Sequence, residues 1–147
     1  LEKGHGLVAE YSFPGEGPTL LFRADIDAVA IAEKSPLPYC SENPGVAHKC
    51  GHDGHTTMLL MLAGLLHEHP LERGRILLLF QPAEENGQGA QLVLQDPWFR
   101  FLRLSAGQAV LPARSSAVPS PSPEKQHMPQ NLKKRFPRPH LYCISCI

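Results

Sequence analysis

One apolar segment, Arg75–Phe80, narrows the possible folds more than any other part of the sequence. After its first residue every position is apolar, which is typical of a central parallel strand covered on both faces. It follows a longer apolar stretch, from about Gly54 to His67, whose length and nearly all-round apolar character predict a helix buried on most sides. A further helix is predicted from Gln88 to Gln95.

Two strands are predicted before this helix. Gly6–Phe13 and Thr19–Arg23 are separated by a Pro/Gly-rich turn, so we expect them to run antiparallel. The second strand, the long helix and the Arg75–Phe80 strand give a βαβ order, which predicts an α/β fold. Asp25 and Asp27 follow the second strand, and they point the same way if the strand continues through them.

The length and charge of the chain further limit its domain organisation and its location in the cell. A chain of 147 residues suffices for one modest domain but not for a large two-domain enzyme. Residues 1–102 carry 7 basic and 13 acidic residues, a net charge of −6, whereas residues 103–147 carry 7 and 1, a net charge of +6. The apolar runs are too short to span a bilayer and no signal segment opens the chain, so we expect a cytoplasmic protein.

The segment after residue 102 has a different composition. It holds 7 of the 15 prolines, including the Pro-Ser repeat at Pro119–Pro123, and shows no sustained periodicity. We interpret residues 1–102 as part of a folded domain. We interpret residues 103–147 as a Pro/Ser-rich basic tail that is disordered or frame-shifted. A basic tail can also contact an acidic partner, and Lys133-Lys134-Arg135 with Arg138 are the candidate residues.

The chemistry concentrates in the run Cys50-Gly51-His52-Asp53-Gly54-His55 and in Glu84-Glu85. Thiolate and imidazole are the usual ligands of zinc, and carboxylates extend the set to harder cations. Glu84-Glu85 follow a buried strand, at the edge where ligands bind to open α/β sheets. We therefore predict a divalent-metal site in which one glutamate is a ligand and the other a general base.

Each part of this pattern has a plainer interpretation. A lone Cys-Gly-His is more often a buried thiol beside a surface histidine, and a lone Glu-Glu is usually solvated; their joint placement at two strand ends favours the metal site. Asp53 and His55 are either near the metal or cap the helix. The helix N-terminus beside Cys50 predicts a lowered thiol pKa.

Three blocks of sequence together resemble a known family. In order and spacing they are similar to the metallo-amidohydrolases, namely the aminoacylase, hippurate hydrolase and indole-acetyl-amino-acid hydrolase group of the aminoacylase/carboxypeptidase metallopeptidases. The resemblance covers about residues 6–102. The blocks are Arg23-Ala24-Asp25-Ile26-Asp27-Ala28, then Asn43-Pro44-Gly45-Val46-Ala47-His48-Lys49-Cys50-Gly51-His52-Asp53-Gly54-His55-Thr56, then Phe80-Gln81-Pro82-Ala83-Glu84-Glu85 with Gly89-Ala90.

The resemblance implies a two-metal hydrolase, with zinc or manganese, that cleaves the amide bond of N-acyl amino acids. It implies part of a zinc-peptidase-like three-layer αβα catalytic domain. Glu84 would be the catalytic general base, and the metal ligands would be Cys50, His52 and Glu85. The implied orienting residues around the metals are Asp25, Asp27, Asp53 and His55.

The sequence also departs from the family pattern. The stretch where the family has a His-Asn segment, about Ser105–Pro112, contains no histidine. By this resemblance we expect the chain to lack the lid or dimerisation domain and the final histidine ligand, and Ala30 and Asn86 are smaller departures. Three of the usual five ligands predict weak metal binding and little hydrolysis by this chain. The alternative function is an inactive fragment that acts as an interaction or regulatory module through its basic tail.

Overall fold

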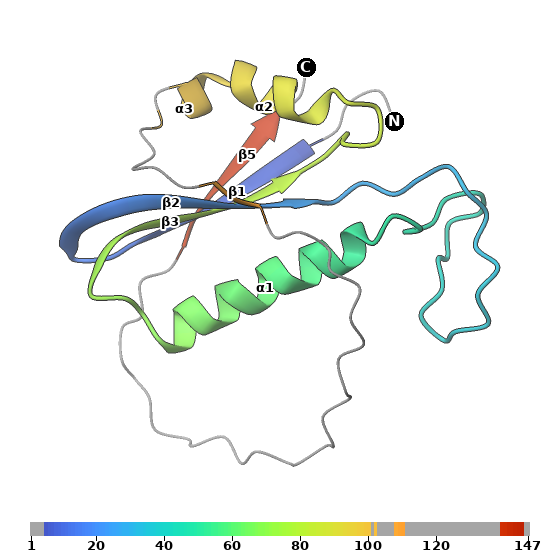
Figure 1. The fold of residues 1–147 in the computed structure, drawn as a ribbon, viewed down its shortest axis with the longest axis horizontal. Coiled ribbons are helices and arrows are strands. Elements are labelled where there is room, and N and C mark those ends of the chain that lie inside the picture. The colour runs from blue at the N-terminus through green and yellow to red at the C-terminus, as the bar shows by residue number, and fades with distance from the viewer. Residues whose placement is uncertain (1–4, 101, 103–107, 111–138, 146–147) are drawn as a thin grey trace, which may run out of the picture.

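The computed structural model describes residues 5–100, 102, 108–110 and 139–145. These residues form a five-stranded mixed sheet in the order β4-β2-β3-β1-β5, with helices on both faces (Figure 1). The elements in chain order are β1 (His5–Ser12), β2 (Gly15–Asp25), α1 (His52–Glu68), β3 (Arg73–Gln81), α2 (Gly89–Gln95), α3 (Pro97–Arg100), β4 (Gln108–Val110) and β5 (His140–Ser145).

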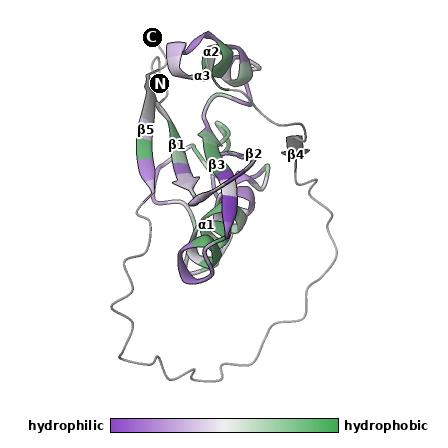
Figure 2. Cartoon of the chain, turned by 90° about the vertical axis from the view of Figure 1, so that its left-hand side faces the viewer, coloured by the Kyte–Doolittle hydropathy of each residue, from purple (hydrophilic) through white to green (hydrophobic). Residues whose placement is uncertain are grey.

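The predicted α/β class is confirmed. β3 contributes residues to both hydrophobic core clusters, one on each face of the sheet. α1 covers one face of the sheet, and α2 and α3 lie on the other (Figure 1). Along β3, Ile76, Leu78 and Phe80 belong to the core cluster on the α1 side. Leu77 and Leu79 belong to the cluster on the α2 side. The helices on both sides of the sheet carry apolar residues (Figure 2), so β3 is buried on both faces, as its continuous apolar run predicts.

β1 and β2 run in opposite directions, as expected, but they are not neighbours in the sheet. β3 lies between them, antiparallel to β1 and parallel to β2. This order places the most apolar strand at the centre of the sheet, where neither face is open to solvent. The β2–α1–β3 segment is the predicted βαβ unit.

The prediction that the long helix is buried on most sides is wrong. Leu59 is 1% exposed and packs on the sheet, but its neighbour Leu60 is 58% exposed. Met61 and Leu65 are also exposed. The reason is that α1 touches only one sheet face, and no other described element covers its outer side (Figure 1).

Two short strands come from the segment that we expected to be a disordered tail. β4 pairs parallel with β2, and β5 pairs antiparallel with β1. The ring of Tyr142 in β5 stacks on Trp98 of α3, with ring centroids 4.8 Å apart. The structure therefore differs from the expected tail at these two segments. The division at residue 102 stays a prediction, and the basic cluster around Lys133 lies outside the described residues.

Among the described residues, no helix combines the length and apolar character needed to cross a membrane. The cytoplasmic location stays a prediction.

The adjacent leucines Leu59 and Leu60 provide a matched test of the α1 packing. We expect Leu59→Ala to lower the free energy of unfolding by about 2–5 kcal/mol, because it opens a cavity against the sheet. We expect Leu60→Ala to change it by less than about 0.5 kcal/mol, because that side chain is solvated. Urea unfolding followed by circular dichroism measures both values. Equal losses would show that the outer face of α1 is covered in solution.

Candidate metal centre

The candidate site lies where β2 and β3 end side by side. Asp25 at the end of β2 pairs in register with Gln81 at the end of β3. α1 begins at the same edge, at His52, and Glu84 and Glu85 follow β3 directly. The carboxyl ends of parallel strands are where α/β sheets bind ligands, because helices begin and loops meet there.

His52 is held in one orientation by the loop after β2. Its side chain is buried, and its Nδ1 lies 2.9 Å from the backbone oxygen of Asp27 and 3.3 Å from Asp27 Oδ1. The backbone oxygen can only accept a hydrogen bond, so Nδ1 is the nitrogen that carries the proton. The lone pair of Nε2 is therefore free to bind a cation.

Nε2 of His52 faces the two glutamates. It lies 3.7 Å from Glu84 Oε2 and 3.7 Å from Glu85 Oε1. Ligand atoms of Cys50, His52 and Glu85 all lie within 4.8 Å of one another. The two 3.7 Å distances from His52 Nε2 are too long for hydrogen bonds. They are close to the separation of about 3.4 Å between two donors on a tetrahedral zinc ion with bonds of about 2.1 Å.

A strained turn positions the glutamates. Ala83 has a positive φ of 58°, which is uncommon outside glycine. The backbone N–H of Glu85 donates to Asp27 Oδ2 at 3.0 Å, and that of Gly89 donates to the Ala83 oxygen at 2.8 Å. A Cβ on Gly89 would lie 2.0 Å from the Pro82 oxygen, so this position requires glycine. Such strain is kept where the surrounding structure needs a particular geometry.

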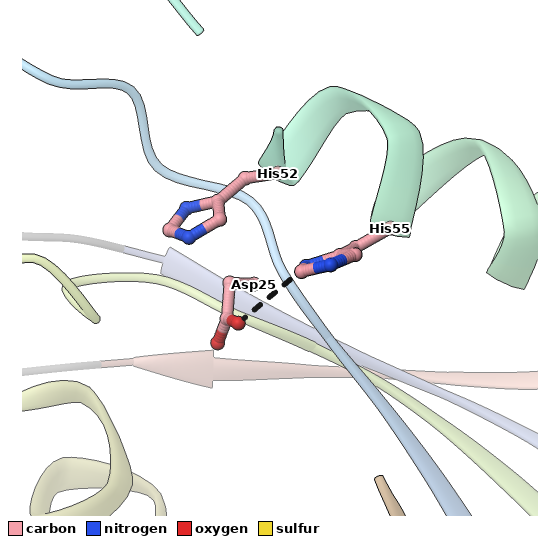
Figure 3. A group of neighbouring side chains, drawn as sticks. All are labelled: Asp25, His52 and His55. Carbon is pink, nitrogen blue, oxygen red and sulfur yellow. Dashed lines mark ion pairs between the residues drawn. The ribbon is translucent and has the colours of Figure 1, made fainter. Parts of the chain in front are cut away.

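Asp25 and Asp27 both reach the site, but not by the expected route. β2 ends at Asp25, so the strand alternation that would place both on one face does not extend to Asp27. Asp27 contacts His52, whereas Asp25 Oδ2 lies 3.8 Å from Nδ1 of His55 (Figure 3). Asp25 also forms an ion pair with Arg23.

Asp53 and His55, which the sequence analysis treated alike, have different surroundings in the structure. Asp53 is exposed and belongs to neither of the two possible ligand groups, whereas His55 joins Asp25 and His52 in the second group. The capping alternative finds no support, because the N-cap residue of α1 is Gly51 and no side chain forms a cap hydrogen bond there. Gly51 has a φ of 84°, which turns the chain sharply between Cys50 and His52.

Thr56 is a residue of the site that the sequence reasoning did not single out. Its hydroxyl lies 3.2 Å from the backbone oxygen of Asp25 and 2.8 Å from that of His52, so it joins the first turn of α1 to the end of β2. The available signal was its place at the end of the Cys50–Thr56 block.

The predicted lowering of the Cys50 pKa is wrong. The pKa of this exposed thiol is raised, first by its hydrogen bond to the Glu85 carboxylate and then by the charges of Glu85, Glu84 and Asp25. The nearby anions disfavour the thiolate more than the helix N-terminus favours it. A cation between Cys50 and Glu85 would reverse this balance, because it stabilises both anions.

Comparison with known proteins identifies a class that combines this fold with this type of site, the metallopeptidases. Residues 21–126 match the sequence model of peptidase family M20/M25/M40, and the chain belongs to this family. The resemblance inferred from the three sequence blocks is thereby confirmed.

Individual relatives are similar over about 60% of the chain. The chain is 51% identical over 92 residues to an N-acetyl-L-cysteine deacetylase of Bacillus subtilis, covering 62% of this chain and 22% of that protein. It is 47% identical to the IAA-amino acid hydrolase ILR1-like 4 of Arabidopsis thaliana, over 60% of this chain and 20% of the relative.

A solved structure shows the same fold. It is the YXEP protein of Bacillus subtilis, described as a dinuclear metal binding peptidase from the M20 family. The TM-score is 0.58 at 42% identity, over 61% of this chain and 25% of that one. The chain thus spans a quarter or less of the length of these relatives.

Thiol alkylation tests the electrostatic coupling between Cys50 and Glu85. In chelator-treated protein we expect Glu85→Gln to lower the pKa of Cys50, because the mutation removes the main cause of its increase. Alkylation of Cys50 by iodoacetamide at pH 8 should then be faster, because more thiolate is present. Peptide mass spectrometry over a pH series measures this rate. Glu68→Gln, at the far end of α1, is the control, and unchanged alkylation in Glu85→Gln would contradict the coupling.

Proposed function

We propose that this site serves the metal-dependent hydrolysis of the amide bond of N-acyl amino acids. The supporting observation is the geometry of His52, whose Nε2 faces two glutamates while its Nδ1 is held by Asp27. The names of the relatives, a deacetylase of N-acetyl-L-cysteine and a hydrolase of IAA-amino acids, support this substrate class.

In this proposal Cys50, His52 and Glu85 hold a divalent cation. The donor set fits, because a thiol, an imidazole lone pair and a carboxylate converge within 4.8 Å. The thiol and imidazole favour zinc, whereas the carboxylates also suit manganese. A bound cation would polarise the substrate carbonyl and make water at the site more acidic. The name of the YXEP protein supports a two-metal centre.

Glu84 is the proposed general base. Its side chain is 43% exposed, so water and substrate can reach it, and its Oε2 lies beside the histidine. Glu84 takes a proton from the attacking water as the oxygen adds to the acyl carbon. It then gives that proton to the amine nitrogen as the C–N bond breaks. Asp27 is a positioning residue, since it fixes the ring of His52.

A cavity next to Glu85 offers room for part of the substrate. Its volume is about 550 Å³. Most of its lining is small and apolar, which suits an acyl group or a small side chain. The lining residues are Ile26, Asp27, Ala28, Val29, Ala30, Pro82, Ala83, Glu85 and Asn86.

Substitution of the proposed base tests the reaction. We expect Glu84→Gln to reduce hydrolysis of N-acetyl amino acids by the zinc- or manganese-loaded chain by about 10²–10⁴-fold, because the amide cannot accept the proton. Metal content should stay unchanged, because Glu84 is not a ligand in this proposal. Amine release and elemental analysis of the same samples measure the two quantities.

Glu68→Gln, on the exposed end of α1, is the control and should retain full activity. Hydrolysis that survives Glu84→Gln would contradict the role of this residue. No hydrolysis by the loaded, unsubstituted chain would contradict the proposed function for this polypeptide. Salt-sensitive binding to heparin or RNA would then favour the interaction module.

A further inference from the structure

We propose that the cavity beside Glu85 selects substrates whose acyl group is apolar and larger than acetyl, and that Ala28 and Ala30 leave the room for this group. The inference rests on the proposed function and deepens it, because amide hydrolysis by itself leaves the acyl group undefined. The cavity has a volume of about 550 Å³. It is lined by residues of the segment after β2, 26–30, and of the segment after β3, 82–86.

Hydrogen bonds of the backbone hold both walls of this cavity in place. Val29 and Ala47 form an antiparallel bridge, with Val29 N–H donating to the Ala47 oxygen at 3.1 Å and Ala47 N–H donating to the Val29 oxygen at 3.0 Å. Ala47 is 1% exposed, so the bridge ties the first wall to the interior. The N–H of Glu85 donates to Asp27 Oδ2 at 3.0 Å and joins the second wall to the first. A cavity that is already formed costs little ordering when a ligand enters it.

The charge of the lining favours the acyl end of an N-acyl amino acid over its other end. The carboxylate of such a substrate lies on the amino-acid side of the amide, and the acyl side is uncharged. Among the described residues that line the cavity, Asp27 and Glu85 are acidic and none is Lys, Arg or His. A carboxylate would therefore lose its hydration there without gaining a cationic side chain as a partner. The apolar lining residues, which suit an acyl chain, are Ile26, Ala28, Val29, Ala30, Pro82 and Ala83.

The size of the cavity distinguishes a large acyl group from a small one. Its volume of about 550 Å³ lies in the range of pockets that hold drug-sized ligands. A water molecule occupies about 30 Å³ in the liquid, so the two-carbon acetyl group would leave most of this space to solvent. Each further CH₂ group that the lining covers raises affinity by up to about fourfold. A longer or bulkier acyl group is therefore the better ligand.

Ala28 and Ala30 are the positions at which this room can be removed. Ala28 is half-buried and Ala30 is exposed, so neither belongs to the tightly packed core. A leucine at either position would take up part of the space between the two walls. Ala83 also lines the cavity, but its φ of 58° would strain a larger side chain.

Calorimetric titration of the metal-free full-length chain with N-acetylglycine and N-hexanoylglycine tests the proposal without turnover by the metal-dependent reaction. We expect the hexanoyl compound to bind about 10-fold or more tightly than the acetyl compound, because its additional CH₂ groups are covered. Ala30→Leu and Ala28→Leu should each weaken hexanoyl binding by about 10-fold and acetyl binding by less than about 3-fold. Ala32→Leu, at an exposed alanine of the same loop outside the cavity, is the matched control and should change neither affinity.

Circular dichroism checks the fold of each variant. Equal affinity for the two compounds, or no binding of either, would overturn the proposal. A hexanoyl preference that survives in both Ala30→Leu and Ala28→Leu would also overturn it, because the acyl chain would then bind elsewhere, for example on the exposed apolar face of α1. Hydrolysis of both compounds by the zinc- or manganese-loaded chain is measured separately. If the metal-free chain shows the expected selectivity but the loaded chain hydrolyses neither compound, the proposed function fails and the acyl site stands.

Discussion

The parallel pairing of β2 with β3 is the interaction on which the core and the site both depend. Its register brings Asp25 level with Gln81, so the two strands end together and deliver their following loops to one edge. The backbone N–H of Ile26 donates to the Gln81 oxygen at 2.9 Å, which continues the pairing one residue past β2. Arg23 Nε donates to Gln81 Oε1 across the same strands. A shift of this pairing by one residue would move the β2 side chains to the other face of the sheet and Asp25 out of line with Gln81.

The site is assembled from backbone contacts as much as from side chains. The Asp27 carbonyl holds His52, the Asp27 carboxylate holds the N–H of Glu85, and the hydroxyl of Thr56 joins α1 to the end of β2. Asp27 therefore links the histidine to the glutamate turn, although it is not in either ligand group. Such outer contacts fix the direction of a metal ligand before any ion binds.

The sequence predicted those parts of the structure that depend on local pattern. The apolar run of β3 predicted a buried central strand, and the Cys50–Thr56 block with Glu84-Glu85 predicted a cluster that the fold brings together. The wrong predictions concern what surrounds a residue. The apolar composition of α1 could not show that its outer face has no described neighbour. The helix N-terminus suggested a low pKa for Cys50, but Glu85 is 35 positions away in the sequence, and its contact arises only from the fold. The pairing of β5 with β1 has no local pattern either.

The position of His52 explains why one imidazole can serve two groups of ligands. It is the first residue of α1, so Cys50 and Glu85 lie on the loop side while Asp25 and His55 lie on the helix and strand side. Its ring cannot turn over without breaking the contact between Nδ1 and Asp27. A ring fixed in this way presents Nε2 to Glu84 and Glu85 without any movement of the protein.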